Sequence, residues 1–176
     1  MQSQRLLAPL VLLVSAAIAA CGDSTSHAVP ATTSPSPAET PAGRGAERER
    51  IQVRIGDAVF QVETARTPEE RAQGLSDRPS LADDAGMLFF LGEERVPGFT
   101  MRRMQFPLDF IWISKDLRVA DVTENVPQPA VAGEELYGIR PDRPVLYALE
   151  VNAGIVRRYG IEVGDEVVLE PAEGTP

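Results

Sequence analysis

The sequence predicts a mainly β (α+β) fold: a single compact, barrel-like or sandwich-like domain with one or two short helices. Two observations support this fold class. Short segments of alternating apolar and polar residues recur along residues 51–171, with turn residues between them, and this pattern is typical of half-buried strands. Only two short segments carry the signals that begin or end a helix. A length of about 120 residues is enough to bury a core, so residues 51–171 are expected to form the domain and residues 172–176 a disordered tail.

The expected strands begin with a hairpin. Residues 51–55 and 59–64 alternate on either side of a Gly56-Asp57 turn, which is a hairpin pattern. Segment 106–114 is apolar on both faces, so we expect a central strand with Pro107 at or before its first paired residue. The other predicted strands are 86–91, 99–104, 117–126, 147–151 and 166–170.

The first expected helix begins after Thr67. The Thr67 hydroxyl can cap the helix, Pro68 suits its first position, and the two glutamates that follow favour the positive end of the helix dipole. Gly74 is expected to end this helix. A second helical segment, one turn long, is predicted over 155–159 and ends at Gly160.

The N-terminal residues predict export. Arg5 precedes an uncharged, mostly apolar run that is too short to span a bilayer and suits a signal peptide over residues 1–20. The tetrapeptide Ile18-Ala19-Ala20-Cys21 resembles the bacterial lipobox, so Cys21 is expected to be lipidated and to become the N-terminus. Acyl chains would then hold the protein at a membrane. Gly22 after the cysteine favours the periplasmic face of the outer membrane if the source is a diderm bacterium.

Residues 21–50 are expected to form a tether. They are rich in Ser, Thr, Pro and Ala and have few large apolar side chains, so they cannot bury enough surface to offset the entropy of ordering. The single histidine of the chain, His27, lies in this segment and is interpreted as a spacer residue. The sequence thus predicts a globular domain carried on a lipidated, disordered tether.

The composition excludes several function classes. The formal net charge is −9 at pH 7, and an acidic chain without a basic stripe is not expected to bind nucleic acid. Cys21 and His27 are the only residues of their types and both precede the domain. The domain therefore lacks the residues for a Ser-His-Asp or Cys-His nucleophile system. No cofactor is predicted.

Several short pieces of the folded part carry a family resemblance through their order and spacing. They are Thr67-Pro68-Glu69-Glu70-Arg71 with Gly74-Leu75, Gly86-Met87-Leu88-Phe89, Phe99 and Met101, Pro107-Leu108-Asp109, Leu149-Glu150-Val151 with Gly154, and Gly160-Ile161 with Gly164-Asp165. From about residue 59 to 168 the chain resembles a bacterial and archaeal family catalogued as domain of unknown function 192, or uncharacterised protein family 0127. The resemblance implies a small, mainly β domain, often exported or membrane-tethered, with no established activity.

The chain departs from the pattern of that family in one segment. Where the family has an aromatic residue followed by Trp-Met-Lys-Asn-Thr, this chain has Phe99-Thr100-Met101-Arg102-Arg103-Met104. A site that this segment builds in relatives could be altered or absent here.

Asp109 is the first candidate functional carboxylate. It lies in an apolar segment, on the same face of the predicted strand as Ile111 and Ile113. A buried carboxylate is costly without a partner, and Arg102 or Arg103 could reach it. We favour a structural group, held by an ion pair or by backbone N–H groups, and keep ligand binding or catalysis as the alternative.

Glu150 is the second candidate, between two apolar residues of another predicted strand. If Asp109 and Glu150 lie on neighbouring strands, they could act as acid and base of a hydrolase on an envelope glycan, or help to hold a divalent cation. Together with Arg102 and Arg103 they are the candidate ligand-binding residues. The hydrolase hypothesis requires that both carboxylates open into one cleft.

Three methionines form a weaker candidate site. Thioethers suit Cu(I), but methionine is also an ordinary core residue. Met87, Met101 and Met104 have no histidine or cysteine of the domain to complete a metal site. Core packing is therefore favoured, and Cu(I) handling is the lesser alternative.

The favoured overall interpretation is a non-enzymatic binding or accessory module of the cell envelope, although the sequence leaves catalysis open. Its expected partners are the membrane, through Cys21, and an envelope protein or glycan. The proline-rich segment 126–144, which includes Gly133-Glu134-Glu135, is either a plain connection or a binding surface.

Overall fold

A computed structural model of the chain describes residues 48–131 and 137–171, all within the unit Gly43–Pro176. The predicted signal peptide, Cys21 and His27 lie outside the described residues, as do most of the tether, the Gly133-Glu134-Glu135 segment and the tail.

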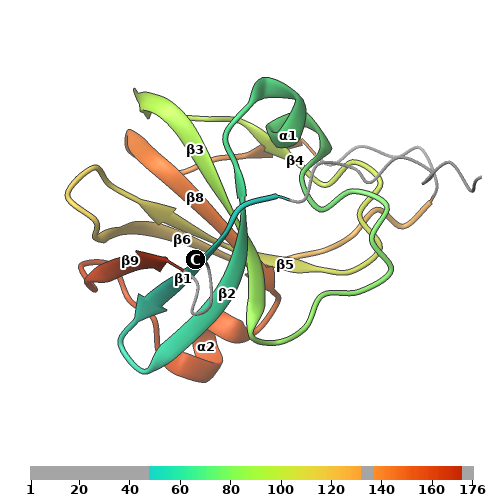
Figure 1. The fold of residues 1–176 in the computed structure, drawn as a ribbon. Coiled ribbons are helices and arrows are strands. Elements are labelled where there is room, and N and C mark those ends of the chain that lie inside the picture. Colours follow the sequence, from blue (N-terminus) through green and yellow to red (C-terminus); the bar gives the residue numbers. More distant parts are fainter. Residues whose placement is uncertain (1–47, 132–136, 172–176) are drawn as a thin grey trace, which may run out of the picture. The chain divides into compact units, whose positions relative to one another are not determined.

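Most of the described chain belongs to one seven-stranded sheet with the order β6-β5-β8-β3-β2-β1-β9 (Figure 1). The strands are β1 (Arg50–Ile55), β2 (Ala58–Ala65), β3 (Ala85–Arg95), β5 (Leu108–Ile113), β6 (Val119–Val126), β8 (Val145–Asn152) and β9 (Val167–Pro171). A small second sheet pairs β4 (Phe99–Thr100) with β7 (Tyr137–Ile139). The prediction of a mainly β domain is confirmed.

The large sheet is mixed and is not a closed barrel. β2 and β3 are parallel neighbours, and the connection between them contains the helix α1 (Pro68–Gln73). At the two edges of the sheet, a single bridge joins Arg118, just before β6, to Glu166, just before β9. The sheet therefore curls until its edges meet at one point, without forming a continuous ladder there.

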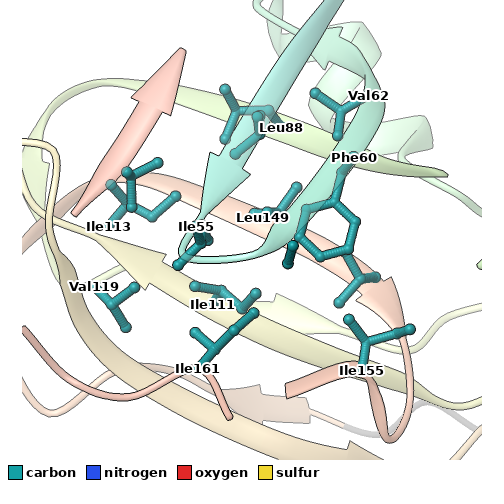
Figure 2. Packing of buried hydrophobic residues seen from close by; sticks show 14 of the residues in the cluster. Ile55, Phe60, Val62, Leu88, Ile111, Ile113, Val119, Leu149, Ile155 and Ile161 are labelled. Atoms are coloured by element: carbon teal, nitrogen blue, oxygen red, sulfur yellow. The ribbon is translucent and has the colours of Figure 1, made fainter. Parts of the chain in front are cut away.

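One face of the curled sheet encloses the larger hydrophobic cluster. Alternate residues of β1, β2, β3, β5 and β8 point into it, as expected for half-buried strands. Figure 2 shows them converging with side chains from β6 and from the segment around α2 (Ile155–Tyr159). The members drawn with labels are Ile55, Phe60, Val62, Leu88, Ile111, Ile113, Val119, Leu149, Ile155 and Ile161.

The opposite face carries a second cluster, rich in aromatic and sulfur-containing side chains. It includes Met87, Phe89, Met101, Phe110 and Trp112. Leu75, which follows α1, and Ile139 of β7 also belong to it. The second cluster lies on the side of α1 and the small sheet, while α2 packs at the other end of the domain (Figure 1).

The two predicted helices are confirmed, and the first has the expected cap. The Glu70 N–H donates to Thr67 Oγ1 at 3.1 Å, and the Thr67 N–H donates to Glu70 Oε2 at 2.9 Å. This reciprocal pair is a capping box. α2 ends at Gly160, which adopts a φ of 62° that suits glycine best.

Three strand predictions need correction. Segment 99–104 forms a strand only over Phe99–Thr100, because a turn follows in which the Met104 N–H donates to the Met101 carbonyl. β5 is buried on both faces but is second from an edge, and β3 holds the central position. β7 was not predicted, because three residues are too few for a visible alternation.

Candidate functional site

Asp109 is fully buried, and both of its carboxylate oxygens accept hydrogen bonds from the backbone. The Asn125 N–H donates to Oδ1 at 2.7 Å, and the Val156 N–H donates to Oδ2 at 2.9 Å. The second bond satisfies an N-terminal amide of α2, whose cap residue Gly154 has no side chain to offer. Asp109 therefore links β5 to the end of β6 and to α2, which is a structural role.

Neither Arg102 nor Arg103 pairs with Asp109, contrary to the expectation from sequence. Arg103 Nη2 lies 2.8 Å from Asp77 Oδ2. Arg102 lines a cavity that also contains Glu150. The carboxylate of Asp109 needs no arginine, because two backbone amides already stabilise it.

Asp109 and Glu150 lie on neighbouring strands but point to opposite faces of the sheet. Glu150 is directly opposite Phe110 in the β5–β8 pair, and Asp109 is opposite Val151. Residues directly opposite share a face, and successive residues alternate between faces. The two carboxylates therefore cannot flank one glycosidic bond. The hydrolase hypothesis requires both of them in one cleft, and this requirement is not met.

Glu150 is a buried residue whose carboxyl oxygens still reach the cavity surface, because no fully enclosed side-chain oxygen or nitrogen of the described residues lacks a hydrogen-bond partner. It is 5% exposed and sits between Met87 of β3 and Phe110 of β5. No described residue donates a hydrogen bond to its carboxyl group or forms an ion pair with it. Burial raises the pKa of Glu150 from 4.5 to about 8, because an apolar environment penalises the charged form. At neutral pH the side chain is therefore mostly a neutral carboxylic acid.

Glu150 lines a cavity of about 260 Å³. Its lining comes from the end of α1 and the residues after it, from β3, and from the segment around β4. The larger apolar members are Leu75, Phe89, Leu91, Phe99 and Met104, and the charged members besides Glu150 are Arg71, Arg95 and Arg102. Phe89 and Phe99 meet edge to face with ring centroids 5.0 Å apart. The result is a hollow of mixed polar and apolar lining with one acid and three guanidinium groups.

The three arginines of the cavity differ in how they are held. Arg71 is half-buried, and its Nη1 donates to the backbone carbonyls of Arg66 and Phe90. The side chains of Arg95 and Arg102 are exposed and pair with no described residue. Two cationic groups thus remain available beside the cavity in a chain whose net charge is −9.

Two glycines allow the strands and the helix to form this cavity. A Cβ atom on Gly86 would lie 2.7 Å from the carbonyl oxygen of Glu150, so only glycine lets β3 approach β8 this closely. Gly74 ends α1 with a φ of 50° and lies against the Phe89 ring. The helix stop predicted from sequence is therefore also part of the cavity wall.

The three methionines of the Cu(I) hypothesis are core residues of the second cluster. All three are buried, and only Met104 lines the cavity. The Nη1 group of Arg48 lies 3.8 Å from the sulfur of Met87, and a cationic neighbour opposes the binding of a metal ion there. The described residues also contain no group of three or more His, Cys, Asp or Glu side chains that could hold a metal ion.

The structure brings together only part of the predicted site. Glu150 and Arg102 share the cavity, whereas Asp109 and Arg103 do not line it. Arg95 could not be recognised from sequence, because it directly follows two glutamates in what looks like an exposed charged turn. The wall that the end of α1 contributes could not be recognised either, because this six-residue helix has no buried face to mark it.

The fold and the cavity define a small, mainly β domain with a ligand-sized hollow beside α1 and β4. The chain belongs to the DUF192 family (Uncharacterized ACR, COG1430), whose model matches residues 51–169. None of the curated proteins matches the chain.

Two crystal structures are similar to this chain. One is a protein from Sinorhizobium meliloti 1021 that is provisionally described as a transcription regulator. It is 35% identical to this chain and superposes with a TM-score of 0.63, and the match covers 70% of this chain and 95% of that protein. The other is a protein of unknown function from Novosphingobium aromaticivorans DSM 12444. It is 33% identical to this chain with a TM-score of 0.63, and the match covers 72% of this chain and 89% of that protein.

Neither helix in the described part of the chain is long and apolar enough to cross a membrane.

Proposed function

We propose that this protein is a non-enzymatic binding module of the bacterial cell envelope, held at a membrane by lipid on Cys21, that takes a small ligand in the Glu150 cavity. The observation that carries the binding role is the position of Glu150, a residue that is 5% exposed, lines the cavity and has no hydrogen bond or ion pair with a described side chain. Its carboxyl group is accessible from the cavity, because no fully enclosed side-chain oxygen or nitrogen of the described residues lacks a partner. A ligand in the cavity can therefore form a hydrogen bond with it in place of water.

Binding has more support than catalysis. Residues 48–176 contain neither histidine nor cysteine, and Glu150 is the one carboxylate among the described cavity residues. Acid–base catalysis of hydrolysis needs a second group within reach of the reacting bond. A transcriptional role, which is the description of the Sinorhizobium relative, has less support because a chain of net charge −9 repels the DNA backbone.

Two features of the sequence support the lipid anchor and the tether. They are the lipobox resemblance at Ile18-Ala19-Ala20-Cys21 and the polar, proline-rich segment after it. Several acyl chains anchor a protein stably without a spanning helix. A flexible segment of some 29 residues gives a mean reach of roughly 30 Å. The domain would then act within that distance of the membrane surface, and Gly22 favours the outer membrane.

Mass spectrometry of the protein purified from membranes tests the anchor. We expect a mature chain that begins at acyl-modified Cys21, and a Cys21→Ser variant that leaves the membrane fraction. A free thiol at Cys21, or a chain that begins at Met1, contradicts the anchor.

A cavity-blocking variant tests the binding role. A Cβ on Gly98 meets no atom within 4 Å, so Gly98→Phe adds bulk beside the cavity without a backbone clash. Ligand-observed NMR with a chemically diverse set of small molecules should give hits on the wild type that Gly98→Phe abolishes. Val163→Phe adds similar bulk at an exposed site outside the cavity and should retain them. Equal spectra for wild type and Gly98→Phe would contradict the proposal.

A further inference from the structure

The geometry points to a ligand class, an inference that rests on the proposed binding role. We propose that the cavity takes a small organic monoanion, with its acidic group at Arg95 and Arg102 and an uncharged hydrogen-bond acceptor at Glu150.

The volume of the cavity sets the size of the ligand. A cavity of about 260 Å³ lies near the lower end of the range of small-molecule sites. We therefore expect a small organic molecule as its ligand.

At the buried side of the cavity, where Glu150 lies, the structure favours an uncharged ligand group that accepts a hydrogen bond. The neighbours of Glu150 in the sheet are Met87 and Phe110, and burial is the sole cause that raises the pKa of its carboxyl group to about 8. At neutral pH Glu150 therefore carries a proton that it can donate to a carbonyl, ether or hydroxyl oxygen.

A ligand ammonium group fits this buried side poorly. It would first have to ionise Glu150, and its path would lie among guanidinium groups. The charged groups on the elements around Glu150 are Arg71 on α1, Arg95 on β3, Arg102 after β4, and Arg48 near Met87. Glu63 of β2 is already paired with Arg48 and Arg78. These neighbours are predominantly cationic, which disfavours a cationic ligand.

The outer end of the cavity requires an anion. Arg95 and Arg102 are exposed and have no ion pair with any described residue, which is also true of Arg140 and Arg143, but only Arg95 and Arg102 of these four line the cavity. A guanidinium group binds a carboxylate in a planar, two-bonded arrangement. Two such groups at one cavity favour a carboxylate on the ligand.

The walls between the two ends require an apolar body. Phe89 and Phe99 stand edge to face, and Leu91 and Met104 also line the cavity. Contact with these side chains is favourable for a ring or a short hydrocarbon body. A planar organic acid with an acceptor at its far end combines the three requirements.

Isothermal titration of the full protein with four matched probes tests this inference. 4-Methoxybenzoate has the acid, the ring and the acceptor. 4-Methoxybenzamide removes the charge, 4-methoxybenzylamine reverses it, and 4-ethylbenzoate removes the acceptor at similar shape. We expect the methoxy acid to bind at least tenfold more tightly than each of the other three.

Two sets of variants assign the contacts. Arg95→Gln with Arg102→Gln should weaken binding of the acid about tenfold and leave the amide unchanged, while the exposed Arg143→Gln serves as the control. Binding of the acid to the wild type should weaken about tenfold for each pH unit above 8, as Glu150 loses its proton. Glu150→Gln, which donates a hydrogen bond at every pH, should show no such slope.

The outcomes separate the inference from the proposed function. If the amide or the amine binds as tightly as the acid, or if the acid does not bind, the ligand class is wrong. The binding role itself falls only if the diverse set detects no difference between the wild type and Gly98→Phe.

Discussion

The two buried carboxylates of this domain lie one strand apart and on opposite faces of the same sheet, yet their surroundings differ completely. Asp109 receives two backbone N–H groups at 2.7 and 2.9 Å. Glu150 receives none from the described residues, and burial raises its pKa to about 8. Asp109 stabilises the fold through these hydrogen bonds, whereas the burial of Glu150 lowers the stability of the folded state at neutral pH. A costly buried group beside a cavity is a stronger indication of function than burial alone.

Removing the satisfied carboxylate should have the largest effect. Asp109→Ala leaves the amides of Asn125 and Val156 buried without an acceptor, and we expect a loss of about 4 kcal/mol in the free energy of unfolding. Urea denaturation measures this loss. Asp109→Asn keeps one oxygen acceptor and should lose about half as much. If Asp109→Ala changes stability by less than 1 kcal/mol, roughly the value of a single neutral hydrogen bond, the contrast between the two carboxylates fails.

Replacing the carboxyl group of Glu150 with an amide, which cannot ionise, should have the opposite effect on stability. The folded state holds the proton of Glu150 up to a pH of about 8, whereas an unfolded glutamate releases it near 4.5. The contribution of Glu150 to stability is therefore complete below pH 4.5, decreases as the pH rises, and is constant again above about 8. Glu150→Gln removes this dependence, so we expect it to stabilise the protein by up to about 3 kcal/mol at pH 7.

Thermal or urea unfolding of wild type and Glu150→Gln across pH 4.5 to 8 measures this difference. The exposed Glu93→Gln on β3 is the matched control and should follow the wild type at each pH. Parallel stability curves for wild type and Glu150→Gln would mean that Glu150 has a partner in the folded protein.

The smallest predicted effect concerns the helix that walls the Glu150 cavity. Thr67→Ala removes the side-chain half of the capping box, and we expect a loss of about 1 kcal/mol in stability. Thr67→Ser keeps the hydroxyl and should stay close to the wild type. Because α1 contributes to the cavity and not to the surroundings of Asp109, hydrogen exchange should increase around α1 and remain unchanged at Val156. Equal increases at both places would contradict this separation.

Much of the fold could be predicted because it depends on local signals. Alternation identified β1 and β2, and the series Thr67-Pro68 to Gly74 identified α1. The sequence also placed Asp109 on the face of Ile111 and Ile113, which the structure confirms. What it could not supply was strand order, since the neighbours of a strand depend on contacts between distant residues.

The candidate site depended on that missing information. Asp109 and Glu150 looked alike in sequence, as single acids in apolar strands. Their difference arises because Glu150 is opposite Phe110 and Asp109 is opposite Val151, a register that no local pattern fixes. The cavity joins residues of α1, β3, the segment around β4 and β8, so its composition follows only from the assembled sheet.

The pairing of β1 with β9 has a consequence for how the protein is made. Ile51 lies opposite Pro171 in this pair, so the beginning of the domain stays without one neighbour until its final strand has been synthesised. Contacts between residues so far apart along the chain form slowly. A nascent chain with this topology therefore remains incompletely folded during translation, which is compatible with the export that we propose.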